Sequence, residues 1–184
     1  MKIGFILPGR EFSNNFLDSW TNVLFNMPPE WKWFHVSGYV PNIFYNRQAL
    51  LDRAKLFRPT HYMWIDSDQV FNFMQLEKLI QHNKPIVSGI YKKSPTLFAC
   101  CDLEGRTMTT DDIKDKTELI EVKANGMGFM LVKAEVFDRI LDPFEPIDPD
   151  QWEDFTFQEK ARNAGFKSYI DPTLIIGHEK KTIL

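Results

Sequence analysis

Cysteine is scarce in this sequence. Its 184 residues contain two cysteines, and these are neighbours, Cys100 and Cys101. Neighbouring cysteines rarely form a disulfide, and two thiols are too few for a structural zinc site. Because reduced thiols are typical of reducing compartments, we expect a cytoplasmic protein without a disulfide framework.

Long apolar runs and a strong excess of one charge are missing as well. No apolar stretch approaches the ~20 residues that span a bilayer, and the one at the N-terminus, about five residues, is too short for a signal peptide. The 22 basic and 25 acidic residues leave a net charge of -3, which argues against nucleic acid as a partner. We therefore expect no membrane span and no nucleic-acid binding.

The first half of the chain alternates short apolar segments with amphipathic ones. The predicted strands are 2–7, 31–36, 61–65 and 85–91, and the predicted helices are 14–27, 43–57 and 74–81. Ser13 is placed to cap the first helix. Such alternation is typical of a parallel α/β sheet covered by helices on both faces.

The second half is more mixed. It contains short β-like pieces over 96–122, a small-residue turn at 125–128, a strand over 129–132, helices over 134–141 and 152–164, and a last β pair around Tyr169 and Ile175. Gly165 is typical of a helix C-terminus. A parallel half followed by a mixed half predicts an α/β fold with a mixed central sheet.

The most informative segment is Asp66-Ser67-Asp68, directly after the predicted strand 61–65. Ligands of open parallel sheets bind beyond the carboxyl ends of the strands. Two carboxylates at such an end could hold magnesium or manganese together with substrate phosphates. The ordinary alternative, which we favour for an isolated Asp-x-Asp pattern, is a turn in which both carboxylates cap a helix or accept hydrogen bonds from backbone amides.

Two later features are open to two interpretations each. Glu153 and Asp154 begin a predicted helix, where the helix dipole stabilises acids, but Asp154 could also act as a general base. His178 is an ordinary surface residue or a neutral imidazole that completes a carboxylate metal site, which would shift the preference from magnesium toward manganese.

The order of these motifs resembles that of a small, family-two-like GT-A fold glycosyltransferase. The resemblance covers about residues 1–180 and rests on the N-terminal strand with its proline loop, Asn46-Arg47 at a helix start, the Asp-Ser-Asp motif, the glycine-rich segment 126–132, the helix-initial Glu-Asp pair and the late histidine. It implies a Rossmann-like α/β/α sandwich. It also implies a single domain, 1–184, with a nucleotide-binding half (1–92) and an acceptor and catalytic half (93–184).

The resemblance further implies a metal-dependent hexosyltransferase. Its donor would be a nucleotide-diphosphate sugar, with UDP-glucose or UDP-galactose as the guess, and its acceptor an unknown hydroxyl. Mn²⁺ or Mg²⁺ would bridge Asp68 and the diphosphate, with Asp66 nearer the ribose or a metal-bound water and His178 as a further ligand. Asp154 would be the base, with Glu153 beside it as a second catalytic candidate. The implied nucleotide-sugar contacts are Pro8, Arg10, Arg47, Asp66, Ser67, Gly126 and Gly128.

Other residues are weaker candidates for the same site. Lys92 and Lys93 follow the fourth predicted strand and could reach phosphate as point charges. Trp64 and Trp152 could stack on a sugar or a base, although most aromatic residues belong to the core. For each lysine a solvated surface position is the ordinary alternative.

Two competing functions stay open. A sugar nucleotidyltransferase shares the strand-helix beginning but would carry a glycine-rich basic loop, whereas segment 7–11 has one glycine. A non-catalytic sugar- or nucleotide-binding module of the same fold is the other, against which the sequence retains Asp66, Asp68 and Asp154. The chain is short for a glycosyltransferase, which predicts a shallow acceptor site and donor hydrolysis by water.

Overall fold

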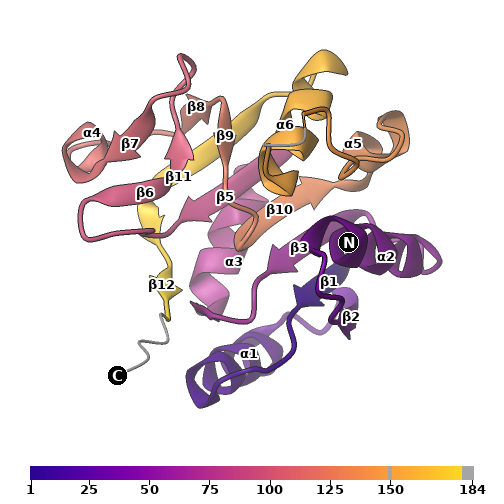
Figure 1. Ribbon diagram of the computed structural model, residues 1–184. Coiled ribbons are helices and arrows are strands. Elements are labelled where there is room, and N and C mark those ends of the chain that lie inside the picture. Colours follow the sequence, from indigo (N-terminus) through magenta and orange to yellow (C-terminus); the bar gives the residue numbers. More distant parts are fainter. Residues whose placement is uncertain (149–150, 180–184) are drawn as a thin grey trace.

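The computed structural model describes residues 1–148 and 151–179. Its centre is a seven-stranded sheet (Figure 1) in the order β2-β1-β3-β10-β5-β11-β8. The strands in that order are Lys32–Gly38, Lys2–Pro8, His61–Ile65, Phe129–Lys133, Ile86–Ile90, Ser168–Ile175 and Ile120–Val122. β1 runs parallel to β2 and β3, β5 parallel to β11, and β10 and β8 antiparallel to their neighbours. The predicted mixed sheet is confirmed.

Helices cover both faces of this sheet. They are α1 (Asn14–Asn26), α2 (Ile43–Lys55), α3 (Phe73–Gln81), α4 (Thr110–Ile113), α5 (Ala134–Arg139) and α6 (Glu153–Asn163). Successive side chains of a strand point to opposite faces. Along β3, Tyr62 and Trp64 therefore join the apolar cluster with α2, α5 and α6, whereas Met63 and Ile65 join the cluster with α1 and α3. This is the expected α/β/α sandwich.

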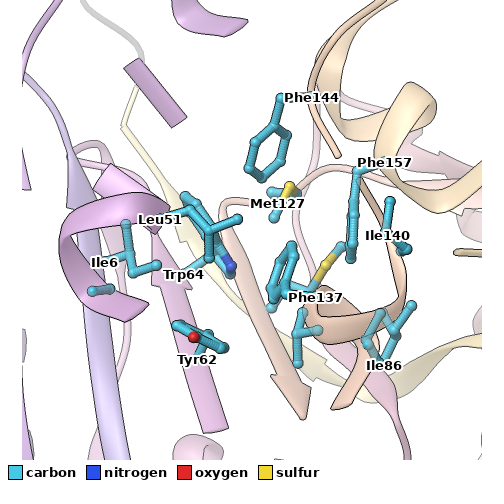
Figure 2. Close-up of a cluster of buried hydrophobic side chains, with 14 of the residues drawn as sticks. Ile6, Leu51, Tyr62, Trp64, Ile86, Met127, Phe137, Ile140, Phe144 and Phe157 are labelled. Atoms are coloured by element: carbon cyan, nitrogen blue, oxygen red, sulfur yellow. The ribbon is translucent and has the colours of Figure 1, made fainter. Parts of the chain in front are cut away.

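The cluster on the α2, α5 and α6 side is rich in aromatic rings (Figure 2). Trp64 meets Phe144 edge-on at 5.3 Å between ring centroids, and Phe137 stacks on Phe157 at 4.9 Å. Trp64 is 0% exposed, and the Arg47 guanidinium lies 5.6 Å from its ring centroid. Of the two interpretations of Trp64, the structure supports the core position and excludes stacking on a ligand, because core contacts cover the whole ring.

Local signals set the helix ends. The Ser13 side chain accepts a hydrogen bond from the backbone N–H of Phe16 at 3.0 Å, as its position before the helix predicts. After α6 the chain turns at Gly165, whose φ of +89° is readily adopted by glycine. The helix begins at Glu153, where no side chain among the described residues caps it.

The C-terminal part differs from the sequence-based expectation. In place of a β pair around Tyr169 and Ile175 there is one strand, β11, whose pairing with β5 shifts between Ile170 and Ile175. Two small sheets form as well. One pairs β4 (Gln69–Val70) with β12 (Gly177–His178), and the other joins β7 (Thr107–Thr109), β6 (Leu97–Cys101) and β9 (Ala124–Asn125). Of the second sheet, β6 and β7 lie in the segment 96–122 that was predicted to hold short β pieces. Cys100 and Cys101 are buried free thiols in β6. Across 1–148 and 151–179, none of the helices combines the length and the apolarity that crossing a membrane requires.

Candidate functional site

The carboxyl ends of β1, β2, β3 and β5 meet at one edge of the sheet. Because β10 is antiparallel to β3, its first residues begin at this same edge. The backbone N–H of Asp66 donates to the carbonyl oxygen of Gly128 at 3.0 Å, and the N–H of Gly9 donates to the carbonyl oxygen of Gly38 at 3.0 Å. The topology thus gathers the Asp-Ser-Asp motif and the glycine-rich turn, as expected for a ligand site at this edge.

A hollow of about 420 Å³ opens beside the motif, and we call it the first hollow. The predicted site residues that line it are Pro8, Arg10, Arg47, Asp66, Ser67, Asp68, Trp152 and Glu153. Sequence reasoning missed Tyr39 and Val40, which line it from the loop after β2. The one sequence signal for them was an aromatic residue, Tyr39, in the loop after a predicted strand. Gly126, Gly128, Asp154 and His178 are not among its lining residues.

Tight packing joins two of the loops that line the first hollow, the loop after β1 and the Asp-Ser-Asp segment. A Cβ added to Gly9 would overlap Ser67 and lie 2.6 Å from its Oγ. The loop after β1 can therefore approach the Asp-Ser-Asp motif this closely because residue 9 has no side chain.

Arg47 is the charged centre of the site, at 4% side-chain exposure. Its Nε donates to the Glu153 carboxylate at 2.9 Å, and its Nη2 donates to the Asp66 carboxylate at 3.2 Å. Burial alone would lower the pKa of Arg47, but the two carboxylates outweigh burial and raise it above the usual range. Nη1 is buried and has no hydrogen-bond partner within residues 1–148 and 151–179. Arg47 thus ties α2 to β3 and to the start of α6, and its role as a nucleotide contact stays a prediction.

Asp66 has its carboxylate turned to this arginine. Burial raises its pKa, and the nearby Arg47 charge acts in the opposite direction. Asp66 is 26% exposed at its side chain, whereas Asp68, two residues on, is 47% exposed. The two acids of the motif therefore occupy different environments. Asp66 belongs to the buried ion-pair network, and Asp68 faces the rim.

Asp68 is paired with His178 across a long stretch of chain. His178 Nε2 lies 3.1 Å from Asp68 Oδ2, while Nδ1 lies 2.8 Å from the carbonyl oxygen of Lys92. A carbonyl oxygen only accepts hydrogen bonds, so Nδ1 carries a proton. Nε2 then donates to the carboxylate when the ring is an imidazolium and faces it with a lone pair when the ring is neutral. The buried Gln69 holds the other carboxylate oxygen through Nε2 at 3.0 Å. The pairing of β4 with β12 brings these residues together.

This pair fits a divalent cation. Two electron-pair donors that face each other need a proton or a cation between them. Neighbouring ligands of an octahedral ion with bonds near 2.1 Å are about 3 Å apart, which is the separation of Asp68 Oδ2 and His178 Nε2. The hydrogen bond from Nδ1 to a backbone carbonyl is a common support for a ligating histidine. Among the described residues no group of three or more His, Cys, Asp or Glu side chains could hold a metal, so water or a phosphate ligand would have to complete the coordination shell.

Asp154 is partly buried at the start of α6. Burial, with the neighbouring Glu153 charge, raises its pKa to about 7, partly offset by Arg47. Its Oδ1 accepts a hydrogen bond from the N–H of Phe155 at 2.8 Å. A base works best when its pKa is near the operating pH. Glu153, in contrast, is 7% exposed at its side chain and paired with Arg47, which suits it to holding the arginine.

Tyr91 lies between the two predicted glycines, and sequence reasoning missed it. A Cβ on Gly126 would overlap the Tyr91 hydroxyl, and one on Gly128 would lie 2.8 Å from its ring. The ring meets His178 at 5.0 Å between centroids. Burial, with the charges of Asp66 and Asp154, raises the Tyr91 pKa well above its usual value. The Tyr91 side chain thus explains why residues 126 and 128 are glycines, since a side chain at either position would overlap it. Close approach of a sugar to these glycines stays a prediction.

Replacing Gly126 by alanine is expected to lower the free energy of unfolding by about 1–3 kcal/mol, because the new methyl group overpacks the Tyr91 side chain. Thermal unfolding measures the effect. Tyr91→Phe removes the overlapping hydroxyl, so the same alanine should cost less in that background. An equal cost in both backgrounds would show that the hydroxyl contact is not the cause.

The remaining candidates lie at the surface. Trp152 is 70% exposed beside the first hollow. Lys92 and Lys93 are exposed, and their Nζ atoms donate to the carbonyl oxygen of Pro95 at 3.0 Å and to the Thr107 hydroxyl at 3.4 Å. Arg10 is exposed on the loop after β1. Contacts of these side chains with a ligand stay predictions.

Comparison with known proteins identifies the fold. No protein-family profile matches the chain, and no curated protein matches it by sequence. Among solved structures, A197 from STIV matches with a TM-score of 0.64 and 16% identity, over 100% of this chain and 97% of that one. GalNAc-T7, solved with UDP, GalNAc and Mn²⁺, matches with a TM-score of 0.65 and 13% identity, over 98% of this chain and 44% of that one. The chain therefore has the GT-A fold that its sequence motifs resemble.

Proposed function

We propose that this protein is a metal-dependent glycosyltransferase that moves a hexose from a UDP-sugar to a hydroxyl acceptor and, when water takes the acceptor's place, hydrolyses the donor. The observation that carries the proposal is the pair of Asp68 and His178, whose facing oxygen and nitrogen atoms stand 3.1 Å apart at the rim of the first hollow. The fold shared with GalNAc-T7, which was solved with UDP and Mn²⁺, supports it. A cytoplasmic location is also part of the proposal.

Asp68 and His178 would hold Mn²⁺ or Mg²⁺, which supplies charge stabilisation to the departing diphosphate without any proton transfer. The first hollow, at about 420 Å³, is within the size range of small-molecule sites and would take the nucleotide. Tyr39, 52% exposed on its wall, offers a ring for the base.

In the reaction, the bond between the sugar's anomeric carbon and the diphosphate oxygen breaks, and the electron pair leaves with the diphosphate. The acceptor oxygen forms the new bond to the anomeric carbon, and its proton passes to a carboxylate oxygen of Asp154. Arg47 keeps Asp66 and Glu153 in place through hydrogen bonds of 3.2 and 2.9 Å. The geometry of Asp154 at the start of α6 then follows from that of its neighbour Glu153.

A panel of nucleotide sugars, with and without manganese, tests the proposal by the nucleoside diphosphate released. We expect UDP-glucose or UDP-galactose to be the best donor and a chelator to stop the release. Nucleoside diphosphate release at an unchanged rate in the presence of the chelator would refute the metal role. Pyrophosphate release from UTP and a sugar 1-phosphate would instead identify a nucleotidyltransferase, and donor binding without any release would identify a non-catalytic module.

The release rate is expected to rise with pH through a midpoint near 7, since Asp154 accepts a proton only when ionised and its pKa is about 7. Initial rates at saturating manganese between pH 5.5 and 8.5 measure this. The midpoint should disappear in Asp154→Asn. A rate that stays flat across this range would mean that no group with this pKa is the base.

A further inference from the structure

A second hollow of about 530 Å³ lies on the other side of the first turn of α2, and no role has been given to it so far. One wall comes from α2, with Phe44, Tyr45 and Gln48, and the other from the segment that precedes α6, with Asp142 and Glu145. Its volume is again in the range of small-molecule sites.

The wall that precedes α6 is held in a fixed shape. Lys160 of α6 donates to the carbonyl oxygens of Asp142 and Glu145 at 2.6 and 2.7 Å. Asp142 has a φ of +44°, which is uncommon for a residue other than glycine. Phe144, between them, is buried among the rings of Trp64 and Phe157 (Figure 2).

The wall from α2 offers an aromatic ring and an unused acceptor. Tyr45 is 71% exposed, although a ring on a helix would ordinarily be placed toward the core. Gln48 donates through Nε2 to Asp52 at 2.9 Å, but its Oε1 is buried without a hydrogen-bond partner in the described part of the chain. A buried oxygen of this kind is costly unless some partner satisfies it.

The two walls belong to the elements that carry the proposed catalytic machinery. On the α2 wall, Gln48 is the residue after Arg47, and Arg47 donates a hydrogen bond from Nε to Glu153. Glu153 in turn is followed directly by Asp154. Lys160 joins the other wall to α6, which also carries Asp154. An occupant of the second hollow therefore lies between the helix that holds the ion-pair network and the segment leading to the proposed base.

The chemistry of the lining selects the occupant. A tyrosine ring, side-chain amides and two carboxylates match a ligand with apolar ring faces and many hydroxyl groups. No basic side chain is among the lining residues that the structure describes. Lys160, the cation bound to this wall, is engaged by the carbonyl oxygens of Asp142 and Glu145. The two carboxylates would therefore repel an anionic ligand and attract an ammonium group.

We propose that the second hollow binds the acceptor and that this acceptor is a saccharide that is uncharged or carries an amine. The inference deepens the proposed function and rests on it. Asp154 lines neither hollow, so the reacting end of the acceptor would extend beyond the second hollow toward Asp154 while the rest of the saccharide occupies the hollow.

Calorimetric titration of the full chain with three trisaccharides tests the inference: cellotriose, the glucosamine trimer and trigalacturonate. We expect the first two to bind, the glucosamine trimer most tightly, and trigalacturonate to bind at least tenfold more weakly. Tyr45→Ala should weaken cellotriose at least tenfold. The matched control is Phe25→Ala, which removes a ring that is 88% exposed on α1 and should leave binding within twofold.

Glu145→Lys should weaken the glucosamine trimer at least tenfold by replacing attraction with repulsion. Glu30→Lys, at an exposed position in the loop between α1 and β2, makes the same charge change elsewhere and should have no effect. Equal losses from both lysine variants would show a general charge effect and overturn the assignment of the hollow.

Titration with UDP and Mn²⁺ separates the two proposals. If UDP binds but no trisaccharide does, or if Tyr45→Ala changes nothing, the acceptor inference is overturned and the proposed function stands. If the trisaccharides bind in a Tyr45-dependent manner and UDP with Mn²⁺ does not, the proposed function is overturned while the second hollow is upheld as a saccharide site. Tightest binding by trigalacturonate would refute the charge argument.

Discussion

Replacing Asp154 by asparagine is expected to lower sugar transfer by about 10²–10⁴-fold, because the amide cannot take the acceptor's proton. Asparagine keeps the shape of the side chain and an oxygen for the N–H of Phe155, which now donates to Oδ1 at 2.8 Å. The measurement is nucleoside diphosphate release at saturating donor. Binding of UDP with Mn²⁺ should change less than threefold, since Asp154 is not among the residues of the first hollow.

The same variant is expected to be more stable than the parent at neutral pH, which separates loss of chemistry from loss of folding. The pKa of Asp154 rises from 3.8 to about 7 on folding, so its ionisation disfavours the folded state. That penalty is absent below pH 3.8, grows as the pH rises, and is complete above pH 7, at most about 4 kcal/mol. Denaturant unfolding of both proteins at pH 4 and pH 8 measures the difference. An Asp154→Asn protein that loses activity and is also less stable at pH 8 would contradict the proposed role.

Replacing Asp68 by alanine is expected to remove the metal-stimulated part of donor turnover, a loss of roughly 10³-fold if the cation supplies several kcal/mol to the leaving group. The manganese concentration for half-maximal activity should also rise about 10–100-fold or more. Titration of release against manganese measures both effects. Asp18→Ala, an exposed aspartate on α1, is the matched control and should behave like the parent.

His178→Gln provides the second half of this test. In the parent, the hydrogen bond from Nδ1 to the Lys92 carbonyl oxygen at 2.8 Å orients the imidazole ring. The glutamine side chain of the variant is uncharged and lacks the ring nitrogen that would bind the cation. We expect a weaker manganese response than in the parent and a smaller loss than in Asp68→Ala. Chelator-sensitive turnover that survives unchanged in Asp68→Ala would place the cation elsewhere.

Much of the fold could be predicted from local pattern. The strand that ends at Ile65, the Ser13 cap and the glycine after α6 are where their sequence signals place them. These features depend on side-chain alternation and on hydrogen bonds between residues three or four positions apart, both of which can be counted along the chain. The order of the motifs also predicted the GT-A fold. The β pair expected around Tyr169 failed because the shifted register of β11 depends on its neighbour β5.

The candidate site depends more on tertiary contacts. The two acids of the Asp-Ser-Asp motif look equivalent in sequence. In the folded protein, however, Asp66 forms an ion pair with the buried Arg47, whereas Asp68 is more exposed at the rim of the first hollow. Tyr91 carried no motif, and its position between Gly126 and Gly128 follows from the antiparallel insertion of β10 beside β5.

By itself, the sequence determined the elements, their mixed order and the residue types available for chemistry, because periodicity, capping and turn preferences act over a few residues. The tertiary structure alone decided which of those residues meet. Glu153 lies 106 positions from Arg47, and His178 lies 110 positions from Asp68. It also decided that Asp154 is buried enough to hold its proton up to about pH 7. Distance and burial arise only when remote segments pack together, and they determine both charge pairing and pKa.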